Sequence, residues 1–309
     1  MHVSLSGGGA RALVFASFFE RMHETEEGRR MLESIQSISG VSAGALVGAP
    51  LAMGVHPTTI RTAMEQGGLR DWMYYPRLAA TALGWRDYMY DGSKVYNRMF
   101  DICKSRSLRI PLSMSVTDML MRQKSLRYDG NASTHNIVNC AVASAAVPGV
   151  FPSRYVNPVG MVYDGGVSGC NFAAESIRTA LHQNQKILLF NAAPWPGFRQ
   201  LIGGSKQRIL STAIDQINTH GIEWLAKSLG PGFRYADGIF QHGNITFVAP
   251  TGIQYAASGG AKGAGNIFYS RYSPLTKRFK AEGIEIANEY MRQARRGTIY
   301  STPFDGSSV

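Results

Sequence analysis

Ser42 lies in the segment GVSAG, where two glycines flank a serine at the spacing of an activated nucleophile. Residues 34–39 are predicted to form a buried strand and residues 43–53 a helix, which puts Ser42 on the sharp turn between them. Such a turn projects the hydroxyl from the sheet edge, and Gly40 and Gly44 leave room for it. The positive end of the following helix favours negative charge on the oxygen. The pattern predicts a nucleophile elbow.

Three consecutive glycines near the N-terminus provide a second part of an acyl-transfer site. They are Gly7, Gly8 and Gly9. Residues 1–5 alternate as a strand does, and residues 10–23 indicate a helix with an apolar face. Unobstructed N–H groups at the start of a helix bind an anion, and for a tetrahedral intermediate they form an oxyanion hole. Arg11 lies just inside this helix, where we expect it to brace the loop through an ion pair.

A nucleotide site is the alternative interpretation of these glycines. Gly7, Gly9 and Ala12 fit the pattern G-x-G-x-x-A after a strand. That fingerprint also requires an acidic residue about 20 positions later, at the end of the second strand. The second strand here ends in Ser39-Gly40, and no Lys-Ser or Lys-Thr follows the glycines as a phosphate-binding loop would require. The nucleotide interpretation is therefore disfavoured.

Asp164 is the candidate general base. Residues 160–163 read as a short strand, and Asp164 stands at its end, followed by Gly165 and Gly166. A carboxylate in this position can accept the proton of the Ser42 hydroxyl directly. An ordinary Asp-Gly turn explains the same three residues on their own. Beside the elbow and the triple glycine, the catalytic interpretation is favoured.

A Ser-Asp-His triad is the competing mechanism, because Ser42, Asp164 and a later histidine follow the chain order of α/β-hydrolases. The candidates are His182, His220 and His242. An α/β-hydrolase elbow normally follows several strands, whereas this one comes near the start of the chain. None of the three histidines lies in a distinctive turn, so the dyad is preferred.

The sequence resembles the patatin-like phospholipases. The resemblance rests on SGGGARA at residues 6–12, GVSAG at 40–44, ASAAVPGVFP at 143–152 and the DGG turn at 164–166, in the family's order. Asn171 matches the asparagine that usually follows that turn. The similarity covers roughly residues 1–192. Ala12 in place of the usual glycine, and the absence of a proline after the asparagine, depart from the family pattern.

The resemblance implies a lipid acyl hydrolase that uses a Ser-Asp dyad and needs neither histidine, nor metal, nor any cofactor. It assigns Ser42 as the nucleophile, Asp164 as the base and the three glycines as the oxyanion loop. We expect a phospholipase A or lysophospholipase acting through an acyl-serine. An acyltransferase or general esterase would use the same residues, and a catalytically degenerate, basic membrane-binding module is the non-enzymatic alternative.

Composition agrees with a globular enzyme. The chain has 309 residues, 44% of them hydrophobic, and no apolar run of about 20 residues that would span a bilayer. The first predicted strand begins almost at Met1, which argues against a signal peptide. Three scattered cysteines form no metal or redox motif. We therefore expect a cytoplasmic protein with peripheral membrane association; secretion by a signal-independent route stays open.

The net charge of +11 favours polyanionic partners, either nucleic acid or an anionic membrane surface. Basic residues concentrate in a predicted helix from Ser273-Pro274 to about Arg296, although a solvated helix face explains such a run as well. Residues 69–92 mix tryptophan, tyrosine and arginine, which suits a bilayer interface, a lid or a packed helix pair. No nucleic-acid motif is present, so we expect an acyl-ester lipid, an anionic membrane and possible binding of a protein activator, with no specific nucleic acid.

The alternation of predicted strands and helices around these residues predicts a three-layer α/β/α sandwich. Its sheet is mainly parallel, and the elbow follows the second strand. We expect one patatin-like catalytic domain over residues 1–309, with a core to about 192. Residues 57–100 form a helical insertion or lid, and residues 193–309 a C-terminal extension. In that extension we expect a helix over 206–229, a strand over 244–249 and a glycine-rich loop over 257–266.

Overall fold

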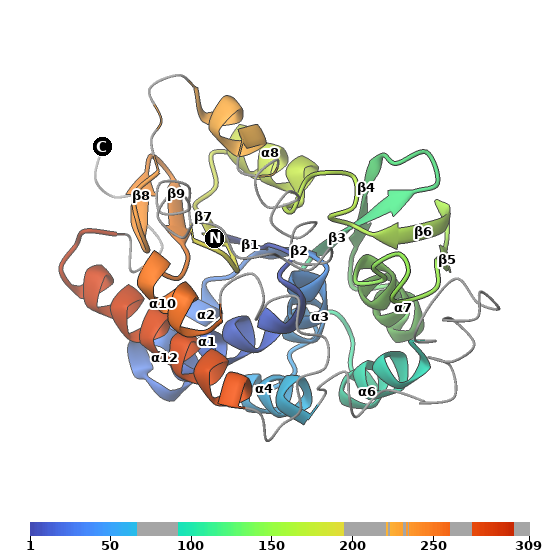
Figure 1. The fold of residues 1–309 in the computed structure, drawn as a ribbon, viewed down its shortest axis with the longest axis horizontal. Helices are drawn as coiled ribbons and strands as arrows, with labels where there is room; N and C mark the ends of the chain where they lie inside the picture. The colour runs from blue at the N-terminus through green and yellow to red at the C-terminus, as the bar shows by residue number, and fades with distance from the viewer. Residues whose placement is uncertain are drawn as a thin grey trace.

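The computed structural model describes residues 1–66, 92–194, 221, 223–230, 233, 235–259 and 274–299 (Figure 1). Three predicted segments lie wholly or mainly outside these residues. They are the aromatic segment 69–92, the helix over 206–229 and the glycine-rich tract 257–266.

The described strands join in one sheet, in the order β5-β6-β3-β2-β1-β7-β9-β8, and β4 pairs with β3 outside this path. The strands are β1 (His2–Leu5), β2 (Ser37–Val41), β3 (Leu112–Asp118), β4 (Gln123–Tyr128), β5 (Arg154–Val156), β6 (Gly160–Asp164), β7 (Ile187–Phe190), β8 (Phe240–His242) and β9 (Ile245–Val248). The five central strands, from β3 to β9, run parallel, while β4, β5, β6 and β8 are antiparallel to their neighbours. The predicted α/β fold with a mainly parallel central sheet is confirmed, as is the position of the elbow after the second strand.

The register of the sheet brings the candidate residues to one level. Val41 of β2 pairs with Ser115 of β3, and Asp164 of β6 pairs with Val116 of β3. Ser42, one residue beyond Val41, therefore stands level with Asp164 on the other side of β3. The glycine loop leaves the sheet at the same edge, because it follows β1, the parallel neighbour of β2.

Helices cover both faces of the sheet (Figure 1). They are the 3₁₀ turn η1 (Gly9–Arg11) and the helices α1 (Ala12–Glu24), α2 (Glu26–Glu33), α3 (Ala43–Ala52), α4 (Pro57–Gln66), α6 (Ser93–Cys103), α7 (Thr134–Ser144), α8 (Ala174–His182), α10 (Gly252–Ala257) and α12 (Pro274–Arg295). Residues 223–229 are also helical.

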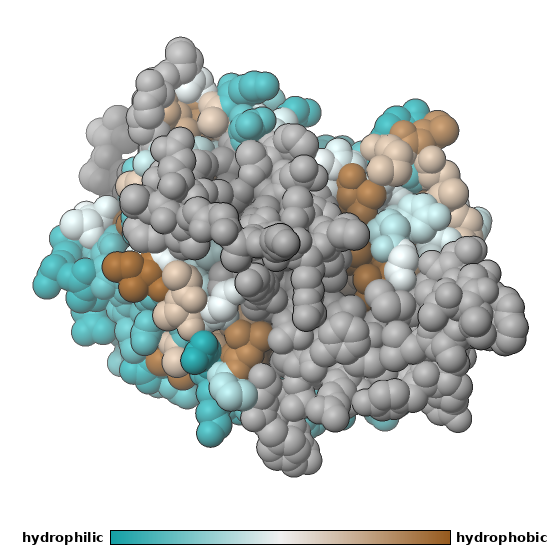
Figure 2. All heavy atoms as spheres, in the orientation of Figure 1, coloured by the Kyte–Doolittle hydropathy of each residue, from teal (hydrophilic) through white to brown (hydrophobic). Residues whose placement is uncertain are grey.

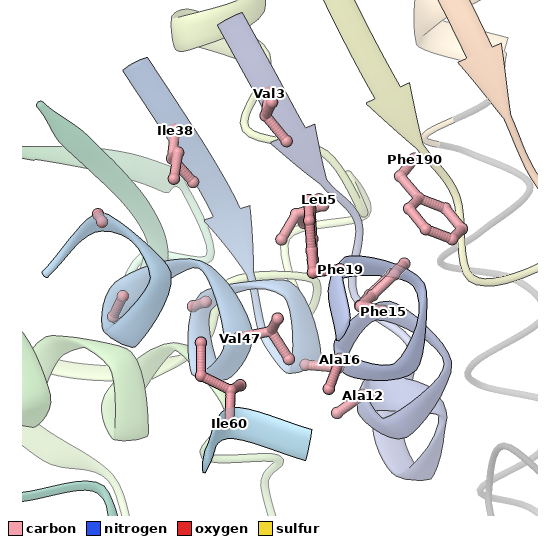
Figure 3. Close-up of a cluster of buried hydrophobic side chains, with 14 of the residues drawn as sticks. Val3, Leu5, Ala12, Phe15, Ala16, Phe19, Ile38, Val47, Ile60 and Phe190 are labelled. Carbon is pink, nitrogen blue, oxygen red and sulfur yellow. The ribbon is translucent and has the colours of Figure 1, made fainter. Parts of the chain in front are cut away.

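Strand β7 shows why the sheet needs a helical layer on each side. Its residues alternate: Leu188 and Phe190 join the apolar cluster under α1 and α3, whereas Ile187 and Leu189 join a second cluster under α8. All four are buried, as expected for a strand with both faces covered. In the first cluster, the ring of Phe15 packs edge-on against Phe190 with centroids 4.7 Å apart (Figure 3).

The region before the elbow differs from the prediction. Strand β2 begins at Ser37, not at residue 34, because residues 26–33 form the helix α2, which the sequence analysis did not predict. Thr25 caps that helix by accepting a hydrogen bond from the Gly28 amide at 3.1 Å, and Glu26 and Glu27 occupy its first turn. These are ordinary N-terminal signals, so the sequence did contain the evidence for α2.

The predicted basic helix is present as α12, and it packs along α1. Within it Lys280 pairs with Glu65, Arg292 with Glu289, and Arg295 with Glu27. Half of the basic residues concentrated here are thus neutralised by carboxylates of the same chain. No helix among the described residues is long and apolar enough to cross a bilayer.

Candidate active site

Ser42 occupies a strained turn directly between β2 and α3. Its φ of 53° and ψ of −118° place a non-glycine residue in a region that L-amino acids seldom adopt. The residue is 8% exposed, so the hydroxyl lies just beneath the surface. A serine held this way at the start of a helix is the geometry that the GVSAG segment predicts.

The flanking glycines are required by close backbone contacts. A Cβ on Gly40 would lie 2.6 Å from the backbone of Gly44, and a Cβ on Gly44 would lie 2.3 Å from the carbonyl oxygen of Leu5 in β1. Both distances are far below van der Waals contact. Strand β2, helix α3 and strand β1 can therefore meet this closely only if these two positions lack side chains.

We expect Gly44→Ala to destabilise the protein by about 2 kcal/mol, because the neighbouring atoms are rigid backbone that must shift to admit a methyl group. Urea unfolding followed by circular dichroism measures the change. Gly130→Ala is the matched control, since its Cβ would meet nothing closer than 4.0 Å. Equal stability of the two variants would contradict the steric requirement.

Ser144, the last residue of α7, fixes the backbone of the elbow. Its hydroxyl oxygen accepts a hydrogen bond from the Ser42 amide at 2.9 Å and donates to the Ser115 carbonyl at 2.6 Å. The sequence analysis quoted Ser144 only within the block 143–152. The available signal was a lone serine in a run of small apolar residues, where a buried hydroxyl needs a partner.

Asp164 ends β6 and is held from three sides. Its amide donates to Ala146 at 3.0 Å, and its own carbonyl accepts from the Thr117 hydroxyl at 2.7 Å. The following Gly165 lies so close to β3 that a Cβ there would stand 2.1 Å from the Ser115 carbonyl oxygen. The double glycine thus allows the turn to pass tightly over β3 and fixes where the carboxyl group stands.

The Asp164 carboxyl group is 4% exposed, and burial raises its pKa from 3.8 to about 6. Two donors oppose that shift, the Ser42 hydroxyl and the Gly166 amide, which lies 2.8 Å from Oδ1. The second oxygen, Oδ2, has no partner in full hydrogen-bonding geometry among the described residues. A base with this pKa is ionised at neutral pH and still accepts a proton readily.

Gly7 packs against the elbow. A Cβ on Gly7 would lie 3.3 Å from the Ser42 Cβ, so the glycine loop and Ser42 are direct neighbours. Asn171 holds this residue on both sides: the Gly7 amide donates to the Asn171 carbonyl at 3.1 Å, and the Asn171 side chain donates to the Gly7 carbonyl at 2.9 Å. The Gly7 amide is therefore already engaged, which differs from the expectation that all three glycines offer free donors.

Gly8 and Gly9 keep their amides available. Neither amide donates a hydrogen bond to any of the residues that the structure describes. Gly9 has a φ of 55°, in the left-handed region that favours glycine, and opens the 3₁₀ turn η1. A Cβ on Gly8 would meet the Ala192 Cβ at 2.4 Å, so the backbone passes close to the residues after β7.

The elbow, the buried carboxyl group and the glycine loop all lie within a range of the chain that matches a known family. The family model described as patatin-like phospholipase matches residues 3–176, more than half of the chain. The chain belongs to the patatin-like phospholipase family. The resemblance recognised in the sequence is thereby confirmed.

Several solved structures are similar to this patatin-like chain. VipD from Legionella pneumophila shares 13% identity, with 93% of this chain and 66% of that chain covered and a TM-score of 0.46. A human GIVD cytosolic phospholipase A2, solved with methyl γ-linolenyl fluorophosphonate, shares 10% identity, with 97% and 59% covered and a TM-score of 0.47. The type III effector protein ExoU shares 12% identity, with 94% and 52% covered and a TM-score of 0.41. The chain spans about half to two thirds of the length of these proteins. No curated protein sequence matches it.

Arg11 of this patatin-like protein connects the glycine loop to helix α12 and to the residues that follow β7. It is 1% exposed, and its guanidinium forms an ion pair with Glu282 of α12, which is 4% exposed. It also donates to the Ala192 carbonyl at 2.5 Å and to the Ser258 hydroxyl at 2.8 Å. The predicted ion pair is present, and its partner comes from outside the family-matched residues.

We expect Glu282→Ala to cost about 3–5 kcal/mol of stability, because it leaves the buried Arg11 cation without its counter-charge. Glu289→Ala is the matched control on the same helix. Glu289 pairs with Arg292 at the surface, and such pairs contribute at most about 1 kcal/mol. Urea unfolding of both variants tests the difference. If the two cost the same, Arg11 does not depend on Glu282 for its charge balance.

The alternative triad gains no support from the described residues. The interactions of the Asp164 carboxyl group come from Ser42 and Gly166, and no histidine is among them. His182 ends α8, and His242 lies in β8 at the edge of the sheet opposite to β6 and β5. His220 lies outside the described residues. No cluster of three metal ligands occurs among the residues that the structure describes.

Proposed function

We propose that this protein hydrolyses carboxylic esters of lipids, as a phospholipase A or lysophospholipase, with Ser42 and Asp164 as a catalytic dyad. The observation that carries the proposal is the contact between the two residues. A serine in a strained elbow stands against a buried carboxyl group whose pKa is raised to about 6. Family membership supports the lipid class of the substrate.

The first half of the reaction forms an acyl-serine. Asp164 takes the proton of the Ser42 hydroxyl as the serine oxygen attacks the ester carbonyl, and a tetrahedral oxyanion forms. We assign the stabilising donors to the Gly8 and Gly9 amides, because the Gly7 amide is engaged by Asn171. The protonated Asp164 then gives its proton to the departing alcohol, and the acyl group stays on Ser42.

The second half releases the fatty acid. Asp164, again ionised, takes a proton from water, which attacks the acyl-serine carbonyl and forms a second oxyanion in the same place. Collapse of this intermediate expels the Ser42 oxygen, which regains its proton from Asp164. The roles of Gly40, Gly44, Gly165 and Gly166 are to hold the two reacting groups at their positions. Arg11 and Asn171 support the loop that carries the amide donors.

We also propose a substrate and a cellular location for this activity. We place the protein in the cytoplasm, where it acts on phospholipid at an anionic membrane surface, in line with its net charge of +11. The proposal includes a single catalytic domain over residues 1–309 and the binding of a protein activator.

Labelling with a fluorophosphonate probe tests the nucleophile directly. The probe forms a covalent bond only with an activated hydroxyl, so the folded protein is expected to be labelled on the peptide that contains Ser42. Peptide mass spectrometry locates the modified residue. Ser42→Ala serves as the negative control. A folded protein that stays unlabelled would favour the catalytically degenerate binding module instead.

A further inference from the structure

Most of the large exposed apolar side chains that the structure describes lie at one place. Seven large hydrophobic residues are exposed among those that the structure describes, and five of them belong to β5, β6 and the turn between β3 and β4. These five, which we call the apolar tip, are Met119, Leu120, Met121, Tyr155 and Met161. Their exposed fractions range from 41% to 69%, and the highest belongs to Leu120. Figure 2 shows brown and tan atoms at the upper right, where the β3–β4 hairpin and β6 stand in Figure 1.

Sheet register shows that the apolar tip is continuous. Tyr155 pairs with Met161 across β5 and β6. Asp118, the last residue of β3, pairs with Val162 of β6, so the turn that begins at Met119 starts beside the part of β6 that carries Met161. Leu120 and Met121 follow in the turn. A contiguous exposed apolar surface of this kind marks an interaction site rather than scattered surface hydrophobics.

The turn that carries the tip is rigid. Asp118 accepts hydrogen bonds from the amides of Leu120 and Arg122, both at 2.9 Å, and its own amide donates to the Arg122 carbonyl at 3.0 Å. Met121 has a φ of 61°, the left-handed position of a three-residue hairpin loop, where glycine is usual. The chain therefore has a large apolar side chain at a position where glycine would be less strained.

The tip projects from the edge of the sheet at which Ser42 stands. Ser42 is level with Val116, and β3 continues past that level to Asp118 before the turn begins. The turn thus lies beyond the ends of β2 and β3, at the edge of the sheet where Asp164 also stands. A surface touched by the tip faces the same side as the candidate active site.

The charge beside the tip indicates its partner. Arg122 and Lys124 follow the turn, with side chains 59% and 40% exposed, and share a single carboxylate, that of Asp118. This leaves a net positive charge next to the apolar residues, within a chain of net charge +11. Apolar side chains flanked by cations match the acyl region and the headgroups of an anionic lipid surface.

We propose that the apolar tip inserts into the surface of an anionic lipid bilayer and so presents the Ser42 edge to the membrane. The role rests on the proposed lipid hydrolysis, but insertion is a binding event that can be measured without turnover. The tip, rather than the paired cations of α12, is the membrane-contacting surface of the described residues.

The test is a triple variant, Met119→Ser/Leu120→Ser/Met121→Asn, in which asparagine suits the left-handed backbone at 121. Co-sedimentation with vesicles of phosphatidylcholine and phosphatidylserine is expected to fall at least about tenfold. Hydrolysis of a soluble short-chain nitrophenyl ester is expected to stay unchanged, which shows that the variant is folded. The matched control is Ile253→Ser, which removes a 72% exposed side chain on α10 and should bind vesicles as wild type does.

A second measurement reports insertion itself. Leu120→Trp is expected to shift its emission to the blue and to be quenched by brominated phospholipid in these vesicles, after subtraction of the wild-type signal. Ile253→Trp should show neither effect. Undiminished vesicle binding by the triple variant overturns the proposal. If, in addition, the wild type is a dimer and the triple variant is a monomer, the tip is the contact surface for a second copy of the chain instead. Ser42→Ala should bind vesicles as the wild type does. Membrane insertion can therefore be tested even if the proposed catalysis proves wrong.

Discussion

Ser42→Ala is expected to reduce fatty-acid release from mixed phospholipid vesicles by at least about 1,000-fold, because no acyl-serine can form without the hydroxyl. The amides of Gly8 and Gly9 and the Asp164 carboxyl group remain in place, so the variant still has the rest of the site. Mass spectrometry of released fatty acids and lysolipids measures the loss and at the same time shows which ester bond is cleaved.

Ser105→Ala is the matched control for this experiment. Ser105 also has a positive φ, 65°, so the same substitution is made at another serine with a positive φ but away from the site. Its activity should stay within about twofold of wild type, since surface substitutions rarely matter. Fatty acid released at the same rate by wild type and Ser42→Ala would exclude the dyad.

Asp164→Asn is expected to have two opposite effects. The first is a loss of activity of about 10²–10⁴-fold, the usual contribution of a general base. In the wild type the base must be ionised, so activity should rise with pH through the Asp164 pKa of about 6 and level off above it. The variant should retain only a low rate without that inflection.

The second effect is a gain in stability at neutral pH. The folded-state pKa of Asp164 lies above its unfolded value of 3.8, so the folded state holds the proton more tightly. The carboxyl group therefore favours folding most below pH 3.8, and this contribution is lost as the pH rises through about 6. At 1.36 kcal/mol per pKa unit, ionisation of Asp164 costs about 3 kcal/mol of stability at pH 8. Asparagine avoids that cost and can still accept from the Gly166 amide.

Urea unfolding at pH 5 and pH 8 measures this second effect. The stability difference between Asp164→Asn and wild type should be larger at pH 8. Asp118→Asn is the control of opposite sign, because hydrogen bonds, first that from the Arg122 amide, lower the pKa of Asp118. That variant should lose stability at neutral pH. A gain for Asp164→Asn that is equal at both pH values would mean that burial does not penalise the charge.

Ser42 and Asp164 could be proposed as reacting groups from the sequence because their positions impose local constraints on it. The elbow needs a glycine two residues either side of Ser42, because a Cβ at either position would lie only 2.3–2.6 Å from backbone atoms of neighbouring elements. The strand register that places Asp164 and Ser42 at the same height of the sheet was not predictable in this way. It depends on β6 pairing antiparallel to β3, and nothing in the short segment 160–163 states which strand it pairs with or in which direction.

The supporting contacts were less accessible to sequence analysis. Asn171 could be noticed, but its engagement of the Gly7 amide depends on the path of the chain after Asp164. The partner of Arg11 lies 271 residues away at Glu282, a separation that no local pattern can bridge. The apolar tip was missed for a different reason: Met119, Leu120 and Met121 continue a buried strand pattern, and only the hairpin turn shows that they are exposed.

The ion pair between Arg11 and Glu282 bears on where this protein can be cut. A recombinant fragment ending at residue 176, where the family match ends, would contain both proposed catalytic residues and still lack the counter-ion of Arg11. It would also lack β7, leaving β1 as an open edge strand with unpaired backbone groups that invite aggregation. The boundaries of sequence similarity are therefore not the boundaries of an independently folding unit, and truncation libraries should keep the chain at least through residue 295.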